Sequence, residues 1–141
     1  MTHRASLFVD TSVWYAAADV SDVGNARAKE ILEGGELLVT SDHVLIETWV
    51  LLRYRLHHSA AERFWDGLRR GVAAVEPVTR ADLEAAWAIG QSFLDQDFSI
   101  VDRTSFAVME RLGIHRAATF DGDFAVYRYG PGRRRAFEIT Q

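Results

Sequence analysis

Cysteine is absent from this chain of 141 residues, which excludes disulfide bonds and thiolate metal sites. Any bound metal would therefore need oxygen or imidazole ligands. No stretch reaches the roughly 18 consecutive apolar residues that suggest a membrane-spanning helix. The apolar stretch near the N-terminus, residues 6–10, is too short for the core of a signal peptide. We therefore expect a cytoplasmic protein that has no membrane association.

Lysine is nearly absent as well, because Lys29 is the one lysine among 16 basic residues and the other 15 are arginine. Arginine makes forked contacts with phosphate and stacks on bases. The codon bias of a GC-rich genome explains the same excess, and the sequence leaves both explanations open. A receiver-type phosphorylation domain needs a lysine after its last strand. Lys29 lies on an early predicted helix, which argues against that class.

The net charge of −4 is unusual for a protein that binds nucleic acid. A nuclease can nevertheless be acidic overall, if its carboxylates hold metal while arginines around them hold the RNA backbone. A phosphatase of the haloacid-dehalogenase type would need a second aspartate two residues after Asp10, and Ser12 occupies that position.

Short apolar segments alternate with amphipathic segments of helical period along the chain, which has the length of one domain with one core. This alternation predicts an α/β fold, a three-layer α/β/α sandwich with a central parallel sheet of four to five strands. We expect strands at 7–9, 36–40, 72–78 and 116–120, with 136–139 as a candidate fifth, and helices at 13–19, 22–32, 42–56, 60–70, 80–94 and 100–112.

Two aspartates directly follow predicted strands. Asp10 follows the first strand and Asp121 follows the fourth. Ligands of open parallel sheets bind beyond the carboxyl ends of the strands, so we expect both side chains at one edge. Each also has a simpler explanation, Asp10 as a helix cap and Asp121 as a turn residue.

Two further acidic residues lie on predicted helices. The neighbours of Glu47 at helical spacing include Val44 and Leu51, which places Glu47 on or beside a buried face. Glutamate is rarely buried unless it is paired or binds metal, and a boundary position facing solvent or paired with Arg53 is the alternative. Asp102 opens the helix before the fourth strand, where the segment 99–102 also fits a capping box.

Carboxylates that converge on one point repel each other. Two unit charges about 4 Å apart cost about 4 kcal/mol at an effective dielectric constant near 20. Four such groups require protonation or a cation, and oxygen ligands select Mg²⁺ or Mn²⁺. These ions activate water and hold phosphoryl oxygens during in-line displacement. The acidic set therefore points to hydrolysis of phosphodiesters.

The chain resembles a PIN domain and, within that family, the VapC-type toxins of bacterial toxin–antitoxin pairs. The resemblance covers nearly the whole chain and implies a single PIN-like nuclease domain over residues 1–141. Four motifs carry the resemblance, and their order and spacing fit the family. They are Phe8-Val-Asp-Thr-Ser12, Ile46-Glu47, Ser99-Ile-Val-Asp-Arg-Thr-Ser-Phe-Ala107 and Thr119-Phe-Asp-Gly-Asp-Phe124.

The resemblance also implies an activity, that of an Mg²⁺- or Mn²⁺-dependent endoribonuclease acting as the toxin of a type II pair. It implies an RNA substrate, a homodimer and a cognate antitoxin. A non-catalytic RNA- or partner-binding module on the same fold is the alternative, although a binder of polyanions gains nothing from clustered carboxylates. The site residues carried over are Asp10, Glu47, Asp102 and Asp121 as catalytic metal ligands, Asp123 as an additional ligand, and Ser12, Thr104 and Ser105 as supporting hydroxyls.

One position departs from the family pattern. Arg103 follows Asp102 directly, where small residues are frequent. From the sequence, the side chain of Arg103 either contacts phosphate or faces solvent.

Overall fold

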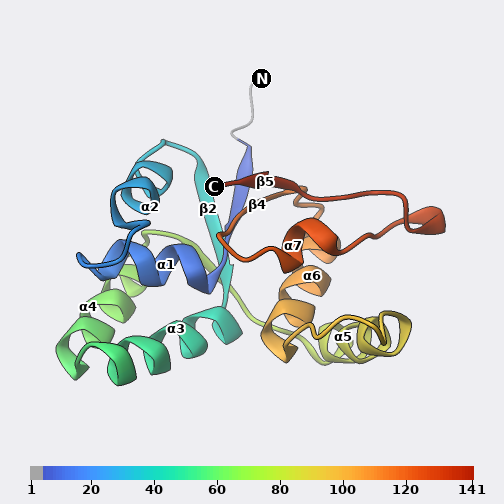
Figure 1. The fold of residues 1–141 in the computed structure, drawn as a ribbon, viewed down its shortest axis with the longest axis horizontal. Coiled ribbons are helices and arrows are strands. Elements are labelled where there is room, and N and C mark those ends of the chain that lie inside the picture. Colours follow the sequence, from blue (N-terminus) through green and yellow to red (C-terminus); the bar gives the residue numbers. More distant parts are fainter. Residues whose placement is uncertain (1–4) are drawn as a thin grey trace.

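A single five-stranded sheet organises the computed structural model, which describes residues 5–141 (Figure 1). The strand order is β3-β2-β1-β4-β5, and every neighbouring pair is parallel. Residues 1–4, which the predicted domain boundary of 1–141 includes, lie outside the described residues. The strands are β1 (Ser6–Val9), β2 (Leu37–Ser41), β3 (Ala74–Glu76), β4 (Arg116–Ala118) and β5 (Glu138–Thr140).

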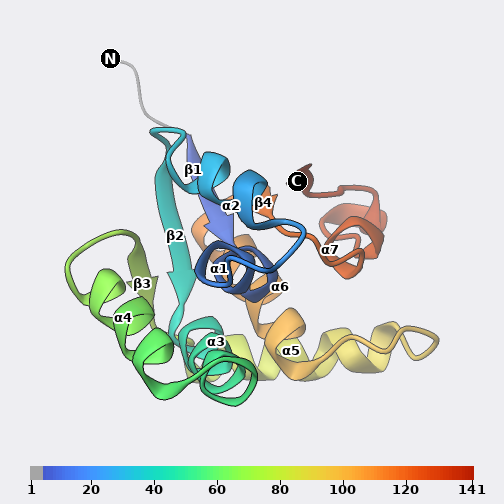
Figure 2. The ribbon, with the colours of Figure 1, turned by 60° about the vertical axis from the view of Figure 1, so that its left-hand side comes forward.

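Helices cover both faces of this sheet, so the predicted three-layer α/β/α sandwich is confirmed (Figures 1 and 2). Helix α3 packs closely against α4, and α5 packs closely against α6. Within residues 5–141, no helix combines the length and the apolar character needed to cross a membrane. The helices are α1 (Thr11–Ala18), α2 (Asn25–Leu32), α3 (Asp42–Arg55), α4 (His58–Arg69), α5 (Arg80–Ser92), α6 (Ile100–Leu112) and α7 (Asp123–Val126), followed by a 3₁₀ turn at Pro131–Arg133.

The order of the strands reverses at β1. From β1 the chain continues to β2 and β3 on one side, and it then returns to add β4 and β5 on the other. Such a reversal leaves a crevice at the carboxyl ends of the two central strands, and ligands of doubly wound sheets bind there. The fold therefore places the residues that follow β1 and β4 at the point where a site is expected.

Several element boundaries differ from the sequence prediction by a few residues, and two of the differences have a clear local reason. The fourth strand ends at Ala118 instead of residue 120, because the hydroxyl of Thr119 and the backbone N–H of Phe120 bond to side chains of the site. Helix α2 begins at Asn25, because the carboxylate of Asp22 accepts a hydrogen bond from the N–H of Gly24 in a turn. The third strand is confined to 74–76.

Helix α7 was not predicted, because its four residues are too few to show helical periodicity. An aromatic cluster holds it against α6. The ring of Phe106 stacks on Tyr127 with centroids 4.3 Å apart, and it meets Phe124 edge to face at 4.9 Å. Phe106 and Phe124 are fully buried. This packing fixes the relative position of the two helices that carry Asp102 and Asp123.

Candidate active site

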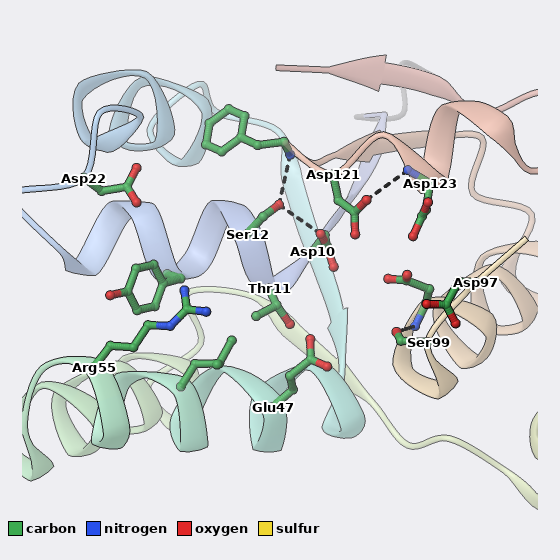
Figure 3. Close-up of a pocket in the computed structure, with 14 residues that line it drawn as sticks. Asp10, Thr11, Ser12, Asp22, Glu47, Arg55, Asp97, Ser99, Asp121 and Asp123 are labelled. Carbon is green, nitrogen blue, oxygen red and sulfur yellow. Dashed lines mark hydrogen bonds between the residues drawn. The ribbon is translucent and has the colours of Figure 1, made fainter.

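An acidic pocket of about 530 Å³ lies at the carboxyl ends of β1 and β4 (Figure 3). Helices α1, α3 and α6 and the segment leading into α7 supply its walls. Half of its fourteen lining residues are acidic, so the pocket concentrates negative charge. The acidic residues are Asp10, Asp22, Glu47, Asp97, Asp102, Asp121 and Asp123, and the others are Thr11, Ser12, Tyr15, Leu51, Arg55, Ser99 and Phe120.

Asp10 lies at the centre of this pocket and is 4% exposed. It occupies the cap position of α1, but its side chain makes no capping hydrogen bond. Its Oδ2 instead accepts hydrogen bonds of 2.9 Å from the hydroxyls of Ser12 and Thr119. Burial raises the pKa of Asp10 above its usual value, the charge of Asp121 adds to the rise, and these two hydrogen bonds oppose it. The helix-cap explanation therefore does not account for this side chain.

Asp102 lies in the first turn of α6, where its backbone N–H donates to the hydroxyl of Ser99. Ser99 thus caps the helix, which leaves the carboxylate of Asp102 free for the pocket. Oxygen atoms of Asp102, Asp121 and Asp123 all lie within 4.8 Å of one another. Burial, followed by the charges of Asp121 and Asp10, raises the pKa of Asp102 to about 8. At neutral pH the metal-free pocket therefore holds a proton on this group.

Thr119 organises the wall opposite α6, and the sequence analysis did not assign it a role. Its hydroxyl donates to Asp10 and accepts from the N–H of Asp121, and both distances are 2.9 Å. Asp121 in turn accepts a 2.9 Å hydrogen bond from the N–H of Asp123. A threonine directly after a buried strand, beside two aspartates, was the available signal. One hydroxyl thereby sets the positions of the acidic residues after β1 and β4.

Glu47 lines the same pocket from α3 and is partly buried (Figure 3). It stands outside the tight group formed by Asp102, Asp121 and Asp123. The predicted acidic residues are thus brought to one pocket. Asp102, Asp121 and Asp123 form the tight group, Asp10 is buried beside it, and Glu47 lies outside it on α3.

Two of the predicted supporting hydroxyls are not in the pocket. Thr104 is buried, donates to the carbonyl of Val101 and lies 3.3 Å from the ring nitrogen of His43. The hydroxyl of Ser105 is buried with no hydrogen-bond partner among the described residues. Both side chains are fully buried, and neither lines the pocket. Thr104 follows Asp102 by two residues on α6 and so faces another direction. Ser12 does line the pocket, beside Asp10.

Arg103 takes neither orientation expected from the sequence. Its guanidinium lies against α5, where Nη1 is 3.4 Å from the carbonyl of Ala86 and the side chain fills the space beside Gly90. The Arg103 side chain fits there because Gly90 has no side chain. Arg103 therefore packs two helices together and does not face the acidic pocket.

The chemistry of these donors fits a hard divalent cation. Three carboxylates with oxygens close together supply the ligand type that Mg²⁺ and Mn²⁺ prefer. Burial and the neighbouring carboxylates favour the protonated form of Asp102, and a cation would favour its ionised form, since an adjacent positive charge stabilises a carboxylate. Asp102, Asp121 and Asp123 are the residues best placed to hold it.

Comparisons with known proteins by sequence and by structure all point to one family. The model of the PIN domain family matches residues 7–128. The 23S rRNA-specific endonuclease VapC20 of Mycobacterium tuberculosis is 43% identical over 121 residues, which cover 84% of this chain and 92% of that protein. The crystal structure of VapC20, described as a Sarcin-Ricin loop cleaving toxin, superposes with a TM-score of 0.80 over 85% of this chain and 93% of that one, at 40% identity.

More distant structures share the fold. A toxin-antitoxin complex from Klebsiella pneumoniae matches with a TM-score of 0.67 at 17% identity, covering 96% of each chain. VapBC2 from Rickettsia felis, bound to a DNA fragment from its promoter, matches with a TM-score of 0.63 at 9% identity, covering 83% of this chain and 88% of that one.

The raised pKa of Asp102 predicts how the metal-free protein responds to pH. Because the folded state favours the protonated form, this group stabilises the fold below its unfolded pKa of 3.8 and loses that contribution as pH rises toward about 8. Asp102→Asn removes the ionisation, so in EDTA the variant should melt several degrees higher than the parent near pH 8 and differ little near pH 4. A change of 1 kcal/mol shifts the melting temperature of such a domain by about 2–6 °C.

Asp95→Asn is the matched control, because Asp95 is exposed on the loop before α6 and does not line the pocket. Its melting temperature should follow the parent at both pH values. If Asp102→Asn also follows the parent at pH 8, the folded state does not raise the pKa of Asp102 as described.

Proposed function

This chain belongs to the PIN domain family, and we propose that it is an endoribonuclease that acts as the toxin of a type II toxin–antitoxin pair. The resemblance to VapC-type toxins is confirmed by the match to VapC20. The observation that carries the proposal is the cluster of carboxylates at the point where the strand order reverses, in a chain 43% identical to a named endonuclease. A module that only binds RNA would gain nothing from it.

The reaction is hydrolysis of an RNA phosphodiester in the acidic pocket, with Mg²⁺ or Mn²⁺ held by Asp102, Asp121 and Asp123. When bound, such an ion neutralises phosphoryl oxygens and makes water a stronger nucleophile. Ser12 and Thr119 hold Asp10 in one orientation toward this group. Glu47 lines the pocket from α3 (Figure 3). We assign its carboxylate the role of accepting the proton of the attacking water.

The substrate class is RNA, the reaction takes place in the cytoplasm, and residues 1–141 act as one nuclease domain. The name of VapC20 refers to 23S rRNA, and its structure is described as cleaving the Sarcin-Ricin loop. Because this chain is 43% identical to VapC20, a ribosomal RNA loop is the first substrate to test.

Removal of single carboxylates tests this proposal. Asp10→Asn and Asp102→Asn should each reduce the cleavage rate of RNA by about a hundredfold or more, since even outer partners of metal ligands are worth about 10–100-fold. Asp95→Asn should leave the rate unchanged. Cleavage should stop in excess EDTA and return with Mn²⁺, as measured on end-labelled RNA by gel. Full activity in EDTA would exclude a metal-dependent mechanism.

Two exposed apolar surfaces support the proposed partners, a cognate antitoxin and a second copy of the chain. Ile46, Val50 and Tyr54 form a stripe along α3 and are 44–85% exposed. Their spacing of four residues places them on one face, beside the pocket residues of the same helix. Trp87, 65% exposed on α5, lies beside Ile100 at the start of α6. Exposed apolar patches of this kind commonly mark interfaces.

We assign the α3 stripe to the antitoxin, which would there obstruct the pocket, and the Trp87 surface to the homodimer. Light scattering should give a dimer for the parent protein and a monomer for Trp87→Ser, whereas Val20→Ser, a change at another exposed apolar residue, should remain dimeric. Val50→Glu should escape inhibition by the product of a neighbouring reading frame and still cleave RNA. A monomeric parent, or inhibition unaffected by Val50→Glu, would contradict the respective assignment.

A further inference from the structure

Arg55 is the one basic side chain among the fourteen residues that line the acidic pocket (Figure 3). The seven carboxylates around it repel a polyanion, and a bound cation compensates only near the tight group of aspartates. The remainder of the pocket therefore has a single positively charged side chain able to attract an RNA phosphate. Arginine suits that purpose, because its planar fork of donors matches two phosphate oxygens.

The position of Arg55 separates it from the reacting centre. It is the last residue of α3 and follows Glu47 by eight residues on the same helix, a span of about 12 Å at 1.5 Å per residue. Figure 3 shows the guanidinium at the end of the pocket formed by α1 and the loop with Asp22, whereas Asp121 and Asp123 lie at the other end. A phosphate bound by Arg55 is therefore not the one that is cleaved but one farther along the same strand.

The guanidinium of Arg55 packs on an aromatic ring but has no ion-pair partner among the described residues. It lies 5.3 Å from the centroid of the Tyr15 ring, within the range of a cation–π contact. The hydroxyl of Tyr15 donates a 2.9 Å hydrogen bond to Asp19, whose carboxylate is also held by Ser21. Among residues 5–141, no carboxylate lies within ion-pair distance of Arg55, whereas Arg27, Arg69, Arg70, Arg111 and Arg116 all have acidic partners.

We propose that Arg55, positioned by Tyr15, forms a phosphate subsite that binds the backbone of single-stranded RNA next to the nucleotide being cleaved. This inference rests on the proposed nuclease function and adds to it a second contact on the substrate. The subsite fixes the direction in which the strand crosses the pocket, from the aspartates at one end to α1 and α3 at the other. A base-paired RNA would have to open locally to occupy both ends.

The test compares Arg55→Gln with Arg53→Gln. The two arginines lie two residues apart at the end of α3 and both are exposed, but Arg53 does not line the pocket. Arg55→Gln should raise KM for a short single-stranded RNA about tenfold, consistent with one charged hydrogen-bonding contact, and leave kcat nearly unchanged. Arg53→Gln should change neither constant. Arg55→Lys keeps the charge without the fork and should fall between Arg55→Gln and the parent.

Two further readouts separate a phosphate contact from a structural effect. The slope of log affinity against log salt should decrease by about 0.7 on Arg55→Gln, the value for one phosphate of a single strand, and stay constant on Arg53→Gln. Backbone phosphates of the RNA can be replaced one at a time by neutral methylphosphonates. At one flanking position this replacement should weaken RNA binding by the parent protein and leave RNA binding by Arg55→Gln unchanged. Equal kinetics of the two glutamine variants, or equal sensitivity to that methylphosphonate, would overturn the proposal.

Binding measured by fluorescence anisotropy in EDTA keeps this test independent of catalysis. A parent protein that binds RNA through Arg55 but does not cleave it in Mn²⁺ would contradict the nuclease function and leave the subsite intact. If the parent cleaves RNA and Arg55→Gln has the same RNA affinity and the same cleavage kinetics, the subsite alone would be contradicted. Equal melting temperatures of parent and variant would exclude unfolding as the cause of any loss.

Discussion

Repulsion among buried carboxylates is the constraint on which the rest of this structure depends. Asp102, Asp121 and Asp123 bring oxygens within 4.8 Å of one another, and Asp10 is buried beside them. The metal-free fold tolerates this only with a proton on Asp102, whose pKa rises to about 8. A divalent cation resolves the same conflict without a proton. Stability and function therefore oppose each other at one point, a trade that is typical of active sites.

The surrounding structure is what keeps the carboxylates in place. The aromatic stack of Phe106 on Tyr127 joins α6 to the segment after α7. The hydroxyl of Ser99 caps α6 by accepting from the backbone N–H of Asp102, so the Asp102 side chain is not used as a cap. Thr119 bonds to Asp10 and to the backbone of Asp121, which ties the ends of β1 and β4 to each other. Packing and neutral hydrogen bonds thus supply the free energy that the charged group costs.

The fold could be predicted from the sequence because its signals are local and regular. Apolar strands alternate with amphipathic helices in the sequence, and the structure has the same order of elements, with boundaries shifted by a few residues. The convergence of Asp10 and Asp121 followed from the rule for parallel sheets. The roles of hydroxyls on a helix were harder to predict, because Thr104 and Ser105 lie close to Asp102 in sequence yet are buried and do not line the pocket. The roles of Thr119 and Arg103 depend on tertiary neighbours, namely the end of β1 and the space beside Gly90. The position of Thr119 near Asp121 was a signal in the sequence, whereas no sequence pattern indicates the space that Arg103 fills.

The central claim is that the pocket exchanges a proton for a cation, and calorimetric titration of the protein with Mn²⁺ tests it most directly. Measured at pH 7 in buffers of different ionisation enthalpy, the titration reports how many protons leave per bound ion. With a pKa of about 8 for Asp102, the account predicts release of about one proton at pH 7, decreasing as pH rises above 8. Mn²⁺ binding at pH 7 with no proton release would contradict it, since the carboxylates would then already be ionised together.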